Sequence, residues 1–157
     1  VKTILSNNPQ TKIYTNSSVG KILAEQGIKF ELLEKGGQTA VKEVILESLE
    51  CPHEPIYKTV PIVQNTGYFI GPRLFYPGDS FTLPGRPIEV LALPIAGPWM
   101  KAAQAIDYAK AAQPKKCFPV HDAIIKTLDF YHPFVQRLLA GEGIDMTILG
   151  AGDSAEF

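Results

Sequence analysis

The segment that most constrains the fold is residues 88–93, a nearly continuous apolar run with the sequence IEVLAL. Runs of this kind are typical of β-strands that are buried on both faces. A helical pattern follows over 98–112, with Pro98 at its expected start, and a further strand is expected over 116–120. Hairpins followed by this β-α-β-α order predict an α/β protein with a mixed sheet.

Turn and cap residues divide the rest of the chain. Asn16 and Ser17 favour a helix start, and Gly27 favours the end of that helix. The Gly71–Pro72 pair predicts a hairpin turn. Further helices are expected over 1–5, 19–26, 123–128 and 133–140, and further strands over 12–15, 28–33, 39–49, 65–70, 73–76 and 146–149. No internal repeat or linker interrupts the chain, so residues 1–157 are interpreted as one domain or one piece of one.

Composition excludes several classes of protein. The chain is 45% hydrophobic and 20% charged, which is enough apolar material for a core. Fifteen basic and sixteen acidic residues give a net charge of −1, so nothing favours nucleic acid or an anionic membrane as a partner. No apolar run is long enough to span a bilayer and no signal peptide is evident, which predicts a cytoplasmic protein.

Two features of the sequence concern its processing and redox chemistry. Cys51 and Cys117 do not form a disulfide framework, and each is expected to be a buried small hydrophobe. The chain begins with Val1 rather than Met, within an expected helix, which indicates a processed, truncated or partial product.

Three strand ends carry residues capable of metal chemistry. His53 follows the strand ending near residue 49, Asp79 follows 73–76, and His121 follows 116–120. Open α/β sheets gather ligands at the carboxyl ends of their strands, and imidazole with carboxylate suits zinc, manganese or iron. Taken singly, each residue has a bland alternative as a cap, a turn or a surface group on an unrelated α/β domain.

The stretches NTGYFIGPRLFYPGDS (65–80) and IEVLALPIAGPWMKAAQAIDYAKAAQPKKCFPVHDA (88–123), with the isolated His53 before them, carry a resemblance. Over residues 1 to about 150 the chain resembles the metallo-β-lactamase superfamily, in the branch related to L-ascorbate-6-phosphate lactonase. The resemblance implies a four-layer αββα sandwich. This chain would contain its C-terminal half and a little of the first half, as a single partial domain over 1–157.

The resemblance also implies a role for each candidate ligand. His53 would bind the first of two divalent ions, zinc or manganese, Asp79 would bridge the ions, and His121 would bind the second. The family's His-x-His-x-Asp-His motif is absent, so the chain looks as if it starts just after that motif. Three ligands would hold at most one ion loosely. We therefore assign no catalytic residue within this chain. For the chain alone we expect little activity, and binding of no ion at all is consistent with this expectation.

Two functions remain open. The resemblance implies a hydrolase that attacks a small ester, lactone or phosphoester through a metal-bound hydroxide. The alternative is a non-catalytic remnant that serves as a structural or interaction module, and its exposed apolar surface would favour a homo-oligomer.

Five other residues have weaker claims. Glu54 and Asp122 neighbour two proposed ligands and are either second-shell acceptors that orient them or solvated carboxylates. Asn65 either fixes the loop after His53 or contacts substrate. Trp99 either packs in the core or lines the substrate pocket. His132 precedes Pro133, an expected helix start, and is interpreted as structural.

Overall fold

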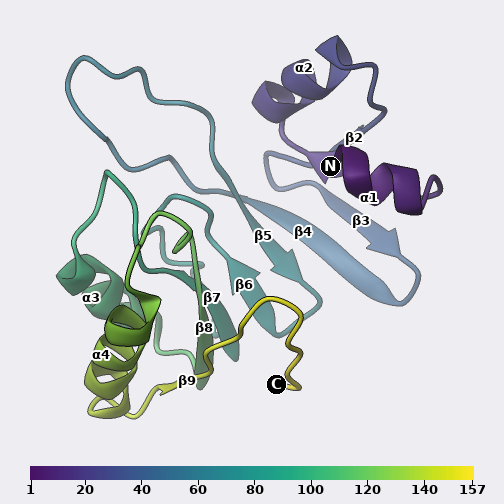
Figure 1. The fold of residues 1–157 in the computed structure, drawn as a ribbon. Helices are drawn as coiled ribbons and strands as arrows, with labels where there is room; N and C mark the ends of the chain where they lie inside the picture. Colours follow the sequence, from purple (N-terminus) through teal and green to yellow (C-terminus); the bar gives the residue numbers. More distant parts are fainter.

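The computed structural model describes all residues 1–157 and is built around a seven-stranded sheet with the order β3-β4-β5-β6-β7-β8-β9 (Figure 1). The predicted mixed α/β sheet is therefore confirmed. Its strands are β3 (Gln38–Val41), β4 (Val44–Glu50), β5 (Thr66–Ile70), β6 (Leu74–Tyr76), β7 (Val90–Pro94), β8 (Lys116–Val120) and β9 (Asp145–Met146).

The sheet changes character at β6. Strands β3 to β6 pair antiparallel, whereas β6 to β9 pair parallel, with Leu91 opposite Cys117 in the β7–β8 register. As a result β4, β6, β7 and β8 all run in the same direction. Their carboxyl ends therefore lie along one edge of the sheet.

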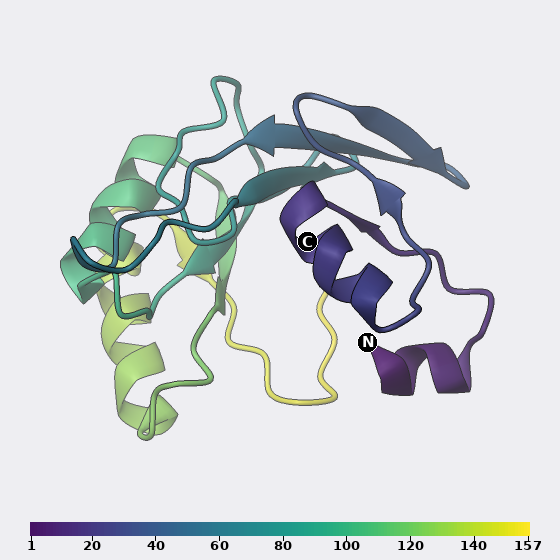
Figure 2. The same cartoon turned by 90° about the horizontal axis from the view of Figure 1, so that it is seen from above.

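Helices α3 (Ala102–Ala112) and α4 (Leu128–Ala140) lie together on one face of the parallel part of the sheet (Figures 1 and 2). Apolar side chains of both helices join those of the central strands in one buried core of 15 residues, which includes Phe75, Leu91, Leu93, Ala109 and Leu139. All five residues of β7 are buried, as the apolar run predicted.

The N-terminal residues form a small unit beside the sheet. It contains α1 (Lys2–Asn7), β1 (Tyr14–Thr15), α2 (Ser17–Glu25) and β2 (Glu31–Leu32), with β1 and β2 paired parallel. The side chain of Asn16 accepts a hydrogen bond from the amide of Val19, so the predicted helix cap is confirmed. The side chain of Gln64 links this unit to the segment that precedes β5. Its side-chain amide accepts hydrogen bonds from Ser17 and Ser18 and donates one to Glu34.

One predicted strand is wrong. Residues 39–49 were expected to be continuous, but β3 and β4 are two strands of a hairpin joined at Lys42 and Glu43. Lys42 has a φ of 55° and so takes the left-handed conformation that turns usually assign to glycine or asparagine. Because lysine is not a typical residue at such a position, the sequence pattern does not indicate this turn. The predicted strand over 28–33 is also shorter, since β2 covers only Glu31–Leu32.

The predicted helix boundaries after β7 and β8 also need correction. The helix expected from Pro98 begins at Ala102, after Lys101, whose amide donates to the side chain of Gln104. The two helices expected over 123–128 and 133–140 are one helix, α4, with Pro133 inside it. Proline removes a single hydrogen bond near the start of that helix, and the buried face of α4 offsets the loss.

None of the helices is both long enough and apolar enough to cross a lipid bilayer.

Candidate metal centre

Three loops at one edge of the sheet bring His53, Asp79 and His121 together. His53 follows β4, Asp79 follows β6 and His121 follows β8, whose carboxyl ends share that edge. The Nε2 atom of His53 lies 3.3 Å from Oδ2 of Asp79, and the Nε2 atom of His121 lies 3.3 Å from Oδ1. Each oxygen of the carboxylate therefore faces a different imidazole.

These distances fit shared metal ions better than hydrogen bonds. A good N–H···O bond spans about 2.7–3.2 Å. Two donors bound to one ion at about 2.0–2.2 Å, with a tetrahedral angle between them, lie about 3.3 Å apart. No group of three or more His, Cys, Asp and Glu side chains is arranged to hold an ion.

His53 is oriented for binding through Nε2. Its side chain is only 8% exposed, and its Nδ1 atom lies within hydrogen-bonding distance of the carbonyl oxygen of Glu54. Donation from Nδ1 would fix the tautomer that leaves the lone pair of Nε2 free. Orientation of the ligand and simple solvation were the two alternatives for the Glu54 carboxylate, and this carboxylate accepts a hydrogen bond from the amide of Phe81. The backbone carbonyl performs the orienting role.

Asn65 connects the loops that carry His53 and Asp79. Its Nδ2 atom donates to the carbonyls of Cys51 and Pro77, each at 2.8 Å, and its Oδ1 atom accepts from the amide of Asp79 at 3.1 Å. The amide of Glu54 also donates to the carbonyl of Asp79 at 2.9 Å. Of the two roles considered for Asn65, the contacts show the one that fixes the loops.

Gly78 makes this connection sterically feasible. It has a φ of 67°, and a Cβ atom at this position would lie 2.1 Å from Oδ1 of Asn65. A side chain would therefore displace the Asn65 amide as well as strain the backbone. A simple turn was one alternative for the Gly78–Asp79 pair. The site also requires glycine at position 78, because Asn65 packs closely against it.

His121 is held differently. Its φ is 61°, a left-handed conformation that is uncommon for a residue with a side chain. Its Nδ1 atom is buried and has no hydrogen-bond partner. The ring instead packs against Trp99, with the ring centroids 6.0 Å apart in an edge-to-face arrangement.

Trp99 forms the inner wall of the centre. It is 7% exposed, and its ring also meets those of His53 and Phe81 edge-to-face, at centroid distances of 6.2 and 5.2 Å. Its indole packs against both imidazoles, which is the packing role considered for it, and the role in a substrate pocket stays a prediction.

Asp122 does not contact the ring of His121. Its Oδ2 atom accepts a hydrogen bond from Nε2 of His132 at 2.8 Å, and His132 is buried on α4. The two alternatives for Asp122 were an acceptor that orients His121 and a solvated carboxylate, and neither includes this partner. Sequence reasoning missed this pair, because His132 belongs to a helix ten residues further along and no local pattern joins the two.

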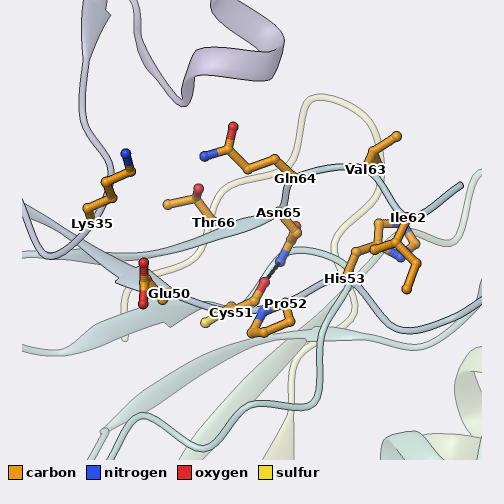
Figure 3. A pocket seen from close by; sticks show the side chains of 10 residues that line it. All are labelled: Lys35, Glu50, Cys51, Pro52, His53, Ile62, Val63, Gln64, Asn65 and Thr66. Carbon is orange, nitrogen blue, oxygen red and sulfur yellow. Dashed lines mark hydrogen bonds between the residues drawn. The ribbon is translucent and has the colours of Figure 1, made fainter.

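A cavity of about 410 Å³ lies beside His53 and is lined by residues 50–53 and 62–66 with Lys35 (Figure 3). The Asn65 amide points into its floor toward the carbonyl of Cys51. Asp79 and His121 do not line this cavity. It adjoins the centre only through His53.

Both cysteines are buried as neutral thiols. Burial raises the pKa of the Cys51 thiol to about 11 and that of the Cys117 thiol to about 12, so both remain protonated near neutral pH. Both are fully buried, which confirms the prediction of small buried hydrophobes. Burial also raises the pKa of Tyr76, and the negative charge of Asp79 adds to that effect, so a neutral phenol stands beside the carboxylate.

Known proteins share this sequence pattern. The sequence model of the β-lactamase superfamily domain matches residues 5–121. Protein Rv0786c of Mycobacterium tuberculosis is 31% identical over 128 residues, which cover 78% of this chain and 59% of that protein. The chain thus spans about 59% of the length of this curated relative.

Solved structures share the fold. A protein of Parabacteroides distasonis, proposed to be a metal-dependent hydrolase, superposes with a TM-score of 0.67 at 24% identity, over 88% of this chain and 64% of that one. Igni18, a metallo hydrolase of Ignicoccus hospitalis, gives 0.68 at 18% identity, over 99% and 73%. CmlA, a diiron β-hydroxylase of Streptomyces venezuelae, gives 0.58 at 13% identity, over 83% and 35%. With the match over residues 5–121, the chain belongs to the β-lactamase superfamily and has the metallo-β-lactamase fold that its strand-end motifs resemble.

Proposed function

We propose that this chain is part of a metal-dependent hydrolase with a two-ion centre. His53 and one oxygen of Asp79 would hold the first ion, and the other oxygen of Asp79 with His121 would hold the second. The observation that carries the proposal is the pair of 3.3 Å distances from opposite oxygens of Asp79 to the two Nε2 atoms. Zinc and manganese suit this donor set, and iron is a third candidate because the structural relative CmlA is a diiron protein.

Two divalent ions bound here would supply Lewis-acid polarisation of a substrate oxygen and activation of water. The residues of this chain position and protect that chemistry. Asp79 sets the separation of the two sites, and Asn65 with Gly78 holds its loop against that of His53. Trp99 shields the inner side of both imidazoles.

The remaining ligands would come from residues outside this sequence. The chain has three histidines and no His-x-His-x-Asp-His motif, and it would contribute two donors to each ion. We therefore propose that residues 1–157 alone bind ions weakly and hydrolyse little. A small ester, lactone or phosphoester is the proposed substrate class, with a lactonase of the L-ascorbate-6-phosphate type as the specific form of the proposal.

Removal of the bridging carboxylate tests the proposal most directly. In the full-length protein, Asp79→Ala should reduce bound metal from about two ions per chain and lower hydrolysis of a panel of lactones, esters and phosphoesters by about 100-fold or more. Elemental analysis and steady-state kinetics measure the two effects. Asp107→Ala, which removes an exposed carboxylate on α3, should change neither. Unchanged metal content in Asp79→Ala would show that Asp79 does not bridge.

One observation favours the alternative of an interaction module. Large apolar side chains are exposed on neighbouring antiparallel strands, at Val44 and Ile45 of β4 and at Ile70 of β5. Exposed apolar residues on a sheet favour association with another surface. An oligomer that forms in solution while the full-length protein binds no metal would favour this reading over the hydrolase.

A further inference from the structure

The conformation of His121 requires a cause outside its own side chain. A φ of 61° is uncommon for a residue other than glycine, although histidine adopts it more often than most residues do, and such a backbone conformation is usually supported by the surrounding structure. The ring provides no such enforcement through polar contacts. A metal-binding histidine usually donates its second ring N–H to an acceptor, but Nδ1 of His121 is buried without a partner. The direction of Nε2 therefore depends on the backbone and on packing against Trp99.

The next residue supplies the polar contact that His121 lacks. The carboxylate of Asp122 accepts a 2.8 Å hydrogen bond from Nε2 of His132, whose side chain is 7% exposed. The carbonyl of Asp122 accepts from the amide of Ile125 at 2.9 Å and closes a turn. Both the side chain and the backbone of Asp122 are thus fixed directly after the left-handed residue.

The anchoring helix is itself tied to the adjacent strand ends. Tyr131, which precedes His132 on α4, donates its hydroxyl to the carbonyl of Ile95 at 2.7 Å. The amide of Ile95 in turn donates to the carbonyl of Val120 at 3.1 Å. Two consecutive residues of α4 therefore hold the segments that leave β7 and β8, and His121 lies at the end of β8.

We propose that the Asp122–His132 hydrogen bond is a clamp that holds the backbone of His121 in its left-handed conformation and so directs Nε2 toward Asp79. His132 is then a positioning residue that acts on the centre through Asp122, rather than a purely structural core residue. The effect on metal binding rests on the proposed function, whereas the effect on the backbone of residues 121–123 does not.

The test uses three variants of the full-length protein. His132→Leu removes the donor and keeps an apolar group in the core. His132→Gln keeps an N–H donor at a similar distance from the backbone, and Asp122→Ala removes the acceptor from the more exposed side of the same bond. Amide hydrogen exchange at Ile125, whose amide donates to the carbonyl of Asp122, reports on the clamp without any metal. Competition with a chelating dye measures the affinity for Zn²⁺.

His132→Leu and Asp122→Ala should each accelerate exchange at the Ile125 amide by about 10-fold or more and weaken Zn²⁺ binding by about 10- to 100-fold. His132→Gln should restore both quantities to within about threefold of the unmodified protein. This rescue separates a hydrogen-bonding role from general loss of packing. If His132→Leu fails to fold, Asp122→Ala gives the same comparison without disturbing the core.

Unchanged exchange at the Ile125 amide in both clamp-breaking variants would overturn the inference, whatever happens to Zn²⁺ binding. Faster exchange with unchanged Zn²⁺ affinity would also overturn it, because the clamp would not position the ligand. If the unmodified protein bound no Zn²⁺, the proposed function would fail. The exchange measurements alone would then support or overturn the clamp.

Discussion

The two sides of Asp79 place an imidazole at the same distance by different means. On the His53 side, hydrogen bonds fix the geometry, through the Glu54 carbonyl to the ring and through Asn65 to both loops. On the His121 side, the ring makes no second hydrogen bond and the backbone takes a left-handed conformation. The two Nε2–Oδ distances are therefore equal, although different contacts hold the two imidazoles in place. The His53 side is determined by contacts within the site, whereas the His121 side depends on how a helix packs beyond it.

The largest expected loss of stability comes from a substitution on the His53 side of the centre, where hydrogen bonds fix the geometry. Gly78→Ala should destabilise the fold by about 2–4 kcal/mol, from the left-handed backbone and from collision with Asn65. Urea unfolding measures the loss. Gly71→Ala is the matched control, because Gly71 has a similar φ of 64° but no atom within 4 Å of the added Cβ. Its cost should be about 1–2 kcal/mol. Equal costs for the two variants would contradict a close-packing role for Gly78.

An effect of intermediate size is expected from removal of the Asn65 side chain, whose hydrogen bonds connect the loops of His53 and Asp79. Asn65→Ala leaves the carbonyls of Cys51 and Pro77 and the amide of Asp79 without their partner, and should cost about 1–3 kcal/mol. Zn²⁺ affinity should fall by about 10-fold or more, measured by competition with a chelating dye.

Its matched control is the preceding residue. Gln64→Ala also removes three hydrogen bonds, but these fasten α2 and Glu34 rather than the centre. It should lower stability to a similar extent and leave Zn²⁺ affinity nearly unchanged. An equal loss of metal in the two variants would mean that Asn65 acts only through general stability.

The smallest expected effect concerns β8, which carries His121. The pKa of Cys117 is raised by burial from its ordinary value of 9.0 to about 12 in the folded protein. The unfolded chain therefore loses this proton first as pH rises. The stabilising contribution is fully present below about pH 9 and declines above it, by at most about 1.4 kcal/mol per pH unit.

Urea unfolding at pH 8 and pH 10 measures this effect. Cys117→Ala should lose less stability over that interval than the unmodified protein, by about 1 kcal/mol. An identical decline in the two proteins would show that the thiol is not buried in solution as the structure places it.

The sequence predicted the edge of the sheet on which the centre forms, but not what holds it. A buried apolar strand and Gly71–Pro72 are local signals, and the rule that ligands gather at strand ends brought His53, Asp79 and His121 together. That they bind metal stays a prediction. The partner of Asp122 could not be inferred, because it depends on how α4 packs on the sheet.

Other details escaped prediction for different physical reasons. The turn between β3 and β4 places Lys42 where the usual turn residue would be glycine or asparagine, so the pattern resembles one long strand. The acceptor for Nδ1 of His53 is the backbone carbonyl of Glu54. Because every residue has a backbone carbonyl, the sequence does not show which one accepts this hydrogen bond. Backbone contacts of this kind leave no signature in the amino-acid sequence.

The change from antiparallel to parallel pairing at β6 has a consequence for the order of folding. Strands β4, β5 and β6 pair with their sequence neighbours, so His53 and Asp79 can meet through comparatively local contacts. The strand β8 reaches its place only after the crossover through α3, and parallel pairing across such a connection is slower to form. We expect the centre to be assembled from its His53 side toward its His121 side, so that the strained ligand is also the last to arrive.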